Sequence, residues 1–126
     1  MIKQIGQVML YVEDQDQALM FWTEKAGFTV VAEEDNGQGM RWIEIAPEPG
    51  AQTSFVLHNK QFVAQMEPDM NLGTPSIMFY SDDLEGLYQA FKDKGVTLGD
   101  VVALPTGRVF NFADDENNYF AVMEKK

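Results

Sequence analysis

The sequence contains no cysteine, which excludes disulfide bonds and thiolate chemistry. It has few basic residues, with nine Lys and Arg against twenty Asp and Glu, and this balance argues against a nucleic-acid partner. No hydrophobic run is long enough to cross a bilayer, and Met1–Gln4 lacks the apolar segment of a signal peptide, so we expect a cytoplasmic protein without a membrane partner. Neither a nucleophile elbow nor a phosphate-binding glycine loop is present, so hydrolase and nucleotide-binding functions are not indicated.

The length and composition of the chain suit one folded domain. The chain has 126 residues, of which 45% are hydrophobic, and its nine Phe, four Tyr and two Trp are sufficient for an apolar core. The formal net charge of −11 would attract a cationic ligand more than an anionic one. A simpler interpretation of the same charge is a well-solvated surface.

The chain nearly repeats itself. The segment Gln7–Asp14 is followed 69 positions later, at position 76, by the similar segment Ser76–Asp83. Each segment is an apolar strand pattern that ends in acidic residues and is followed by a helix pattern and then a glycine. A duplicated unit of this kind indicates a two-fold scaffold with a cavity at the seam.

The pattern predicts two βαβββ modules. Asp14 should cap a helix over Gln15–Ala26 that Gly27 ends, and Asp83 should cap a second helix that reaches Lys94. The expected strands are Ile5–Val12, Phe28–Glu33, Met40–Ala46, Gln52–His58, Ser76–Ser81, Thr97–Leu104, Arg108–Ala113 and Asn118–Glu124. Asn36-Gly37 indicates a hairpin, and residues 59–74 are expected to form an irregular linker. Residues 1–126 are therefore expected to form a single domain with modules at 1–58 and 75–126.

Alternation along the strands predicts which side chains face the cavity. In the first strand of each half, the set Gln7, Met9 and Tyr11 corresponds to Ser76, Met78 and Tyr80. In the other strands the same argument selects Trp42 with Glu44, Val109 with Asn111, and the set Gln52, Ser54, Val56 and His58. The residues expected to line a ligand site are Gln7, Tyr11, Trp42, Glu44, Ser54, Ser76, Tyr80 and Asn111.

This order of elements resembles the vicinal oxygen chelate superfamily, which includes glyoxalase I, extradiol dioxygenases, and the fosfomycin- and bleomycin-resistance proteins. The resemblance lies in Val8–Asp14, Lys25–Phe28, Arg41–Pro47, Gly107–Asp114 and Glu116–Tyr119, where Asn117 stands at the usual glycine. It implies an α+β fold in which two βαβββ modules form a curved mixed sheet around a cleft, and it implies a homodimer.

The resemblance also implies where metal ligands would lie. Metal-using members bind a divalent ion with His or Gln, Glu, His and Glu, and the matching positions here are Gln7, Ser54 (or Gln52), Ser76 and Val122. Serine and valine do not replace imidazole and carboxylate ligands of Zn²⁺, Ni²⁺ or Fe²⁺. The departures from the family pattern therefore indicate that metal chemistry has been lost. A rearranged set of Gln7, His58 and Glu124 is the alternative metal site.

Individual side chains have both structural and functional interpretations. Glu44 is either an exposed residue paired with Arg41 or Arg108, or a pocket carboxylate that anchors a cation or abstracts a proton. Trp42 either packs in the core or offers an aromatic wall. His58, the only histidine, is either a surface residue or a general base at the rim.

Three functional hypotheses follow. The first is a metal-free protein without a cofactor that binds a small molecule, sequestering a cationic or aromatic compound as the bleomycin-resistance branch does. The second is a glyoxalase-like lyase or isomerase, or a dioxygenase, with a divalent metal such as Zn, Ni or Fe in the cleft. The third is a structural module in which residues 59–74 form a dimer contact or a lid.

Overall fold

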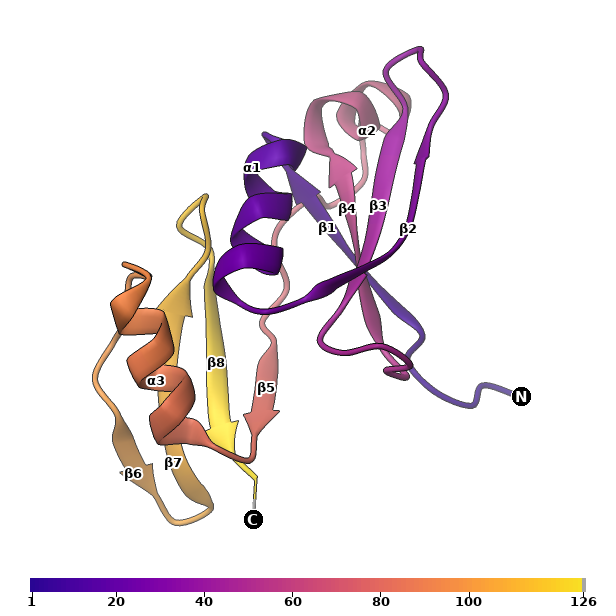
Figure 1. Ribbon diagram of the computed structural model, residues 1–126. Coiled ribbons are helices and arrows are strands. Elements are labelled where there is room, and N and C mark those ends of the chain that lie inside the picture. The colour runs from indigo at the N-terminus through magenta and orange to yellow at the C-terminus, as the bar shows by residue number, and fades with distance from the viewer. Residues whose placement is uncertain (126) are drawn as a thin grey trace. The chain divides into compact units, whose positions relative to one another are not determined.

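The computed structural model describes residues 1–125. The chain divides into two compact units, Met1–Thr74 and a second unit that begins at Pro75. Figure 1 shows both units, and each has a four-stranded sheet of its own.

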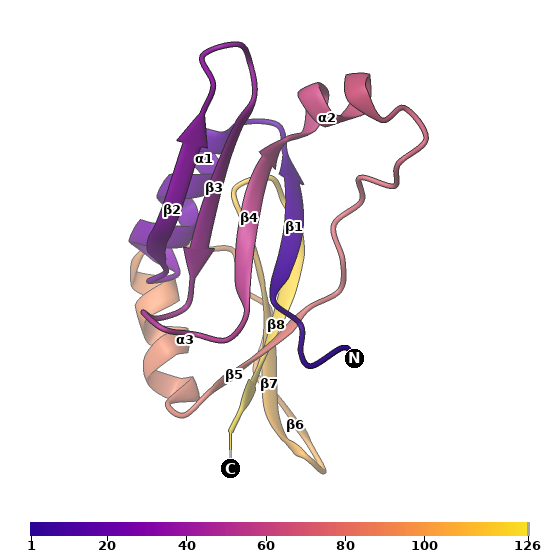
Figure 2. The same ribbon diagram turned by 90° about the vertical axis from the view of Figure 1, so that its right-hand side faces the viewer.

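The first unit is a four-stranded mixed sheet with a helix on one face. Its elements are β1 (Gln7–Val12), α1 (Gln15–Met20), η1 (Phe21–Lys25), β2 (Thr29–Asp35), β3 (Arg41–Ala46), β4 (Ser54–Asn59) and α2 (Lys60–Met66). The strand order is β1-β4-β3-β2, and only the β1–β4 pair is parallel. Figure 2 shows α1 behind this sheet and α2 following the end of β4.

The second unit repeats this arrangement. Its elements are β5 (Met78–Ser81), α3 (Leu84–Asp93), β6 (Val102–Leu104), β7 (Gly107–Ala113) and β8 (Tyr119–Glu124). The strand order β5-β8-β7-β6 matches that of the first unit, and β5 and β8 are again parallel. The predicted α+β fold with two βαβββ modules is therefore confirmed.

The helix caps predicted from the sequence are present in both units. The side chain of Asp14 accepts a hydrogen bond from the backbone N–H of Gln17, and Asp83 accepts one from Gly86. Each cap satisfies a donor that the first turn of a helix leaves without an intrahelical partner. Gly27 and Gly95 follow the two helices with φ of 80° and 76°, a conformation that glycine adopts without steric cost.

The helix of the first unit ends in a π-helical turn, η1, which the sequence pattern does not predict. The N–H of Ala26 donates to the carbonyl of Phe21, five residues earlier. Asp14 and Gly27 are 13 positions apart, whereas Asp83 and Gly95 are 12 apart. The π turn thus accommodates one additional residue in the first unit.

Each unit has its own apolar core between the helix and the sheet. In the first, Trp22 of η1 packs edge-on against Phe55 of β4 with ring centroids 5.3 Å apart. In the second, Phe91 of α3 packs on Phe110 and Phe112 of β7. The strand residues in these contacts mark the face of each sheet that carries its helix.

Three local predictions need correction. Residues 59–74 are not wholly irregular, because α2 begins after Asn59, whose side chain accepts a hydrogen bond from the N–H of Phe62. Ser76 lies before β5, which begins at Met78. The strand predicted over Thr97–Leu104 is shorter, since only Val102–Leu104 pairs with β7 and Leu98 forms an isolated bridge with Phe112. Within residues 1–125, no helix is both long enough and apolar enough to cross a membrane.

Candidate functional site

The face of the first sheet opposite α1 gathers most of the polar and aromatic side chains singled out from the sequence. Phe55 contacts Trp22 on the helix side, so its neighbours along β4 at even positions project from the other side. Strand register then places the following residues on the face opposite α1: Gln7, Met9, Tyr11, Glu34, Trp42, Glu44, Ser54, Val56 and His58.

An aromatic row crosses this face at one end of the sheet. Tyr11 pairs with His58, His58 pairs with Trp42, and Trp42 pairs with Glu34, from β1 through β4 and β3 to β2. The rings of Tyr11 and His58 are stacked, with centroids 5.7 Å apart and planes inclined by 23°. Directly paired side chains on one face of a sheet are close enough to form a continuous surface. Tyr11 and His58 turn ring faces toward each other, and the row as a whole supplies aromatic surface that ends at Glu34 on β2.

A polar cluster lies farther along the same face. Oε2 of Glu44 accepts a hydrogen bond of 2.6 Å from the hydroxyl of Ser54 and one of 3.3 Å from Nε2 of Gln7. A carboxylate only accepts hydrogen bonds, so these contacts orient both partners as donors toward it. The cluster fixes the position of a negative charge on the same face of the sheet as the aromatic row.

His58 has a second close contact on this face. Its Nε2 lies 3.2 Å from Sδ of Met9, which projects from β1 one pair away from Tyr11. Burial lowers the pKa of His58 below its usual value of 6.5, because a desolvated imidazole resists protonation. The ring is therefore neutral near pH 7.

The segment after α2 reaches the aromatic row. The hydroxyl of Tyr11 donates to Sδ of Met70 over 3.6 Å. Lys60, at the start of α2, lies 3.8 Å from a carboxylate oxygen of Glu13 at the end of β1. These two contacts hold part of the predicted linker against the end of the first sheet.

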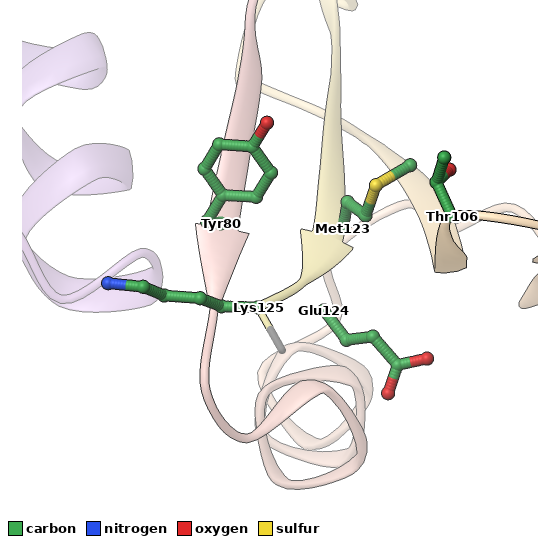
Figure 3. A pocket seen from close by; sticks show the side chains of 5 residues that line it. All are labelled: Tyr80, Thr106, Met123, Glu124 and Lys125. Atoms are coloured by element: carbon green, nitrogen blue, oxygen red, sulfur yellow. The ribbon is translucent and has the colours of Figure 1, made fainter.

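The corresponding face of the second sheet is less polar. Strand register pairs Met78 with Ala121, which pairs in turn with Asn111. It also pairs Tyr80 with Met123, which pairs in turn with Val109. A hollow of about 310 Å³ is lined by Tyr80, Thr106, Met123, Glu124 and Lys125. Figure 3 shows the side chains of Tyr80 and Met123 next to each other on β5 and β8.

Fewer of the residues that the sequence selects for a ligand site line the hollow in the second unit. Tyr80 is 69% exposed and lies on its border, whereas Asn111 does not line it. Both oxygens of Glu124 are engaged by Arg108, which also donates to Glu85 at the start of α3. The face opposite α1 is therefore the stronger candidate site.

The residues do not fit the divalent metal site that the family pattern implies. Val122 is 1% exposed and pairs with Phe79 and Phe110, so it faces the core rather than a cavity. Gln7 and Ser54 point donor groups at Glu44 instead of presenting a set of ligands. Across the described part of the chain, no three His, Cys, Asp or Glu side chains come together as a metal ion would require.

The alternative set of Gln7, His58 and Glu124 does not fit either. Gln7 pairs with Ser54, four residues from His58 along β4, which is a separation of about 13 Å. The carboxylate of Glu124 forms a hydrogen-bonded ion pair with the guanidinium of Arg108. Side chains so placed cannot bind one ion together, because metal–ligand bonds are about 2 Å long.

The structure thus brings together Gln7, Glu44 and Ser54 in one cluster, and Tyr11 and Trp42 in one row. The sequence pattern favours a surface position for His58 and gives no role to Glu34, yet both belong to the row. Alternation along β4 already places His58 on the same face as Ser54. The pairing of His58 with Trp42 depends on the register between β3 and β4, which a sequence pattern does not specify.

Comparison with known proteins adds a family and a fold. The family model described as the Glyoxalase/Bleomycin resistance protein/Dioxygenase superfamily matches residues 4–122. The uncharacterized protein YetH of Bacillus subtilis (strain 168) is 40% identical over 125 residues, which cover 98% of this chain and 100% of YetH.

Solved structures resemble the whole chain. TnmS3, an antibiotic binding protein from Streptomyces sp. CB03234, is 27% identical with a TM-score of 0.83, covering 99% of this chain and 98% of TnmS3. A member of the Glyoxalase/bleomycin resistance protein/dioxygenase superfamily from Sphaerobacter thermophilus DSM 20745 is 26% identical with a TM-score of 0.81, covering 98% of each chain.

Proposed function

Because this chain belongs to the Glyoxalase/Bleomycin resistance protein/Dioxygenase superfamily, we propose that it binds a planar, cationic aromatic small molecule and sequesters it without chemical change. The proposed ligand lies on the face opposite α1. The observation that carries the proposal is that Trp42 of the aromatic row and Glu44, a carboxylate held in place by hydrogen bonds, lie two residues apart on the same face of β3.

The aromatic row supplies the stacking surface. Tyr11, His58 and Trp42 are consecutive partners across three strands, so together they supply aromatic ring surface for a planar ligand. Contact of a cation with an aromatic face contributes about 0.5–2 kcal/mol, and tryptophan is the best of the aromatic side chains for this purpose. A neutral His58 adds ring surface without repelling a positive charge.

Glu44 supplies the complementary charge. Its Oε2 is occupied by Ser54 and Gln7, whereas Oε1 accepts no hydrogen bond within the described chain. A carboxylate that is already held in place loses little side-chain freedom when a ligand binds, which favours affinity. A hydrogen bond between Oε1 and a ligand N⁺–H would be charge-assisted and therefore stronger than a neutral one.

The relatives and the overall charge support this assignment. The structural neighbour TnmS3 is described as an antibiotic binding protein. The net charge of −11 raises the local concentration of cations and speeds their association at low ionic strength. Homodimer formation remains a prediction from the family resemblance.

Isothermal titration calorimetry with proflavine, a planar cation, and with acridone, a neutral compound of similar shape, tests the proposal. We expect proflavine to bind more tightly than acridone, Glu44→Gln to weaken proflavine at least about tenfold while changing acridone little, and Trp42→Leu to weaken both. Glu48→Gln, in the exposed turn after β3, is the matched control that should leave both affinities unchanged.

Two results would overturn the proposal. One is the absence of proflavine binding at a dissociation constant below about 1 mM. The other is binding that is unaffected by both Glu44→Gln and Trp42→Leu, since the ligand would then occupy another part of the molecule. Thermal unfolding of each variant without ligand checks that a lost affinity does not reflect a lost fold.

A further inference from the structure

We propose that Met9 and His58 form a binding site for a soft monovalent metal ion, Cu(I) or Ag(I), on the face opposite α1. Nε2 of His58 lies 3.2 Å from Sδ of Met9. Strand register pairs Met9 with Val56 and His58 with Tyr11, so the two side chains meet diagonally across the parallel strands β1 and β4. The two donor atoms are therefore directed toward each other from adjacent strands.

The chemistry of the two donor atoms selects the ion. Thioether sulfur is a soft ligand that favours Cu(I), and imidazole nitrogen binds copper readily. Zn²⁺ prefers thiolate, imidazole and carboxylate ligands in a closed set, which this pair does not provide. The chain contains eight methionines and no cysteine, so thioethers are its only sulfur ligands. The site thus differs from the divalent site that the family pattern implies in both its position and its ion.

The distance allows one ion to contact both atoms. Bonds of about 2.0–2.3 Å to nitrogen and sulfur add up to more than the 3.2 Å between Nε2 and Sδ. The ion would therefore lie off the line that joins the two atoms, in a bent arrangement with a third position left open. The unbranched methionine side chain can adjust its sulfur position by the small amount that coordination requires.

At His58, ion binding requires the tautomer that carries its proton on Nδ1. Without metal, an N–H at Nε2 can donate to the sulfur of Met9 at the observed distance. With metal, the lone pair of Nε2 must face the ion, so the ring proton resides on Nδ1. The ring stays neutral in both states, and binding a monovalent ion displaces no net proton from it.

The second unit provides an internal comparison. Met78 and Met123 occupy the positions that correspond to Met9 and His58, because Tyr80 pairs with Met123 as Tyr11 pairs with His58. The site in the first unit differs from the pair in the second unit because it has the imidazole of His58 in place of a second thioether. Selective binding at Met9 before Met78 would therefore identify His58 as the group that sets affinity.

The test is a metal titration of the full chain without any aromatic cation. Ag(I), which is redox-inert in buffer, is added to protein with ¹³C-labelled methionine methyl groups, and the methyl signals are followed by NMR. We expect the first equivalent to shift the Met9 methyl and the His58 ring signals while the Met78 and Met20 methyls keep their positions. Cu(I) affinity is then measured anaerobically by competition with bicinchoninate.

Matched variants assign the ligands. Met9→Leu and His58→Gln should each raise the dissociation constant for Cu(I) at least about tenfold, whereas Met20→Leu, at a half-exposed position on α1, should leave it unchanged. The inference is wrong if both ligand variants bind Cu(I) as the original chain does, if Met78 responds before Met9, or if Zn²⁺ binds as tightly as Ag(I). Because no aromatic cation is present, none of these failures bears on the proposed binding of aromatic cations.

Discussion

Ser54 donates a 2.6 Å hydrogen bond to Oε2 of Glu44 from a diagonal position on the neighbouring strand. Ser54 is buried, with 6% of its surface exposed, so its hydroxyl has few alternative partners in water. Gln7 donates to the same oxygen from β1. The carboxylate of Glu44 on β3 is thus tied to both β4 and β1.

Removing this hydrogen bond should destabilise the first unit. Hydrogen bonds to charged groups contribute about 1.5–3 kcal/mol, so we expect Ser54→Ala to lower the free energy of unfolding by about 1–2 kcal/mol, since Glu44 is partly accessible to replacing water. A double-mutant cycle with Glu44→Gln, measured by urea denaturation, gives the coupling between the two residues. A coupling below about 0.3 kcal/mol would contradict the structural assignment.

Gln15 joins the start of α1 to the sheet. Its Nε2 donates to the backbone carbonyls of Arg41 (2.7 Å) and Leu57 (2.9 Å), and the side chain is buried. Replacing Gln15 by leucine would leave two carbonyls without these donors, at a cost of about 1–3 kcal/mol for each acceptor that stays buried and unpaired. The expected loss appears in chemical denaturation, and Gln17→Leu at an exposed position of the same helix should change stability far less.

Stability should depend on pH through His58. Because burial lowers its pKa in the folded state, the unfolded chain binds more protons between that value and the usual 6.5. The free energy of unfolding should therefore decrease as the pH falls through 6.5 and level off below the folded-state pKa. The groups that face the ring are Met9 and Tyr11 from β1 and Trp42 from β3. Glu44 is diagonal to His58 in the register, and its carboxylate accepts hydrogen bonds from Ser54 and Gln7.

The measurement for His58 is direct because the chain has a single histidine. NMR titration of its ring signals gives the folded-state pKa, and urea denaturation at several pH values gives the slope. His58→Gln should remove this part of the pH dependence. A folded-state pKa at or above 6.5 would contradict the effect of burial.

The turn between β7 and β8 depends on one left-handed residue. Asn117 has φ of 62°, and the side chain of Asp114 accepts hydrogen bonds from the N–H groups of Glu116 and Asn118. Asparagine adopts this left-handed conformation more readily than most residues with a side chain do. Alanine in the same conformation is destabilised by about 1 kcal/mol. We expect Asn117→Ala to lower the thermal midpoint and Asn117→Gly to leave it nearly unchanged. Equal losses for both variants would show that the side chain of Asn117, and not its φ, matters.

The sequence is sufficient to predict the parts of the fold that depend on local signals. The alternation in β1, the caps Asp14 and Asp83, and the hairpin at Asn36-Gly37 each rest on a few neighbouring residues. The helix α2 escapes prediction because Lys60–Met66 has only seven residues, none of them buried, and is too short to repeat an apolar spacing. The π turn escapes it because a one-residue insertion leaves the apolar pattern of a short helix almost unchanged.

The candidate site is predictable only in part. Alternation selects Gln7, Glu44 and Ser54 for one face, but their mutual hydrogen bonds follow from the register between β1, β4 and β3. That register joins residues far apart in the sequence, so a local pattern does not specify it. The contact between Met9 and His58 joins residues 49 positions apart and has no local signature at all.

The extra residue in η1 lies after the ring that packs on the sheet. Trp22 comes eight positions after the cap Asp14, as Phe91 comes eight positions after the cap Asp83, so both rings leave their helices at equivalent places. The difference in length falls between this ring and the closing glycine, which are five positions apart in the first half and four in the second. Because the π turn absorbs the added residue, the packing face of the helix stays in register with the sheet, and only the path from helix to the following strand differs between the halves.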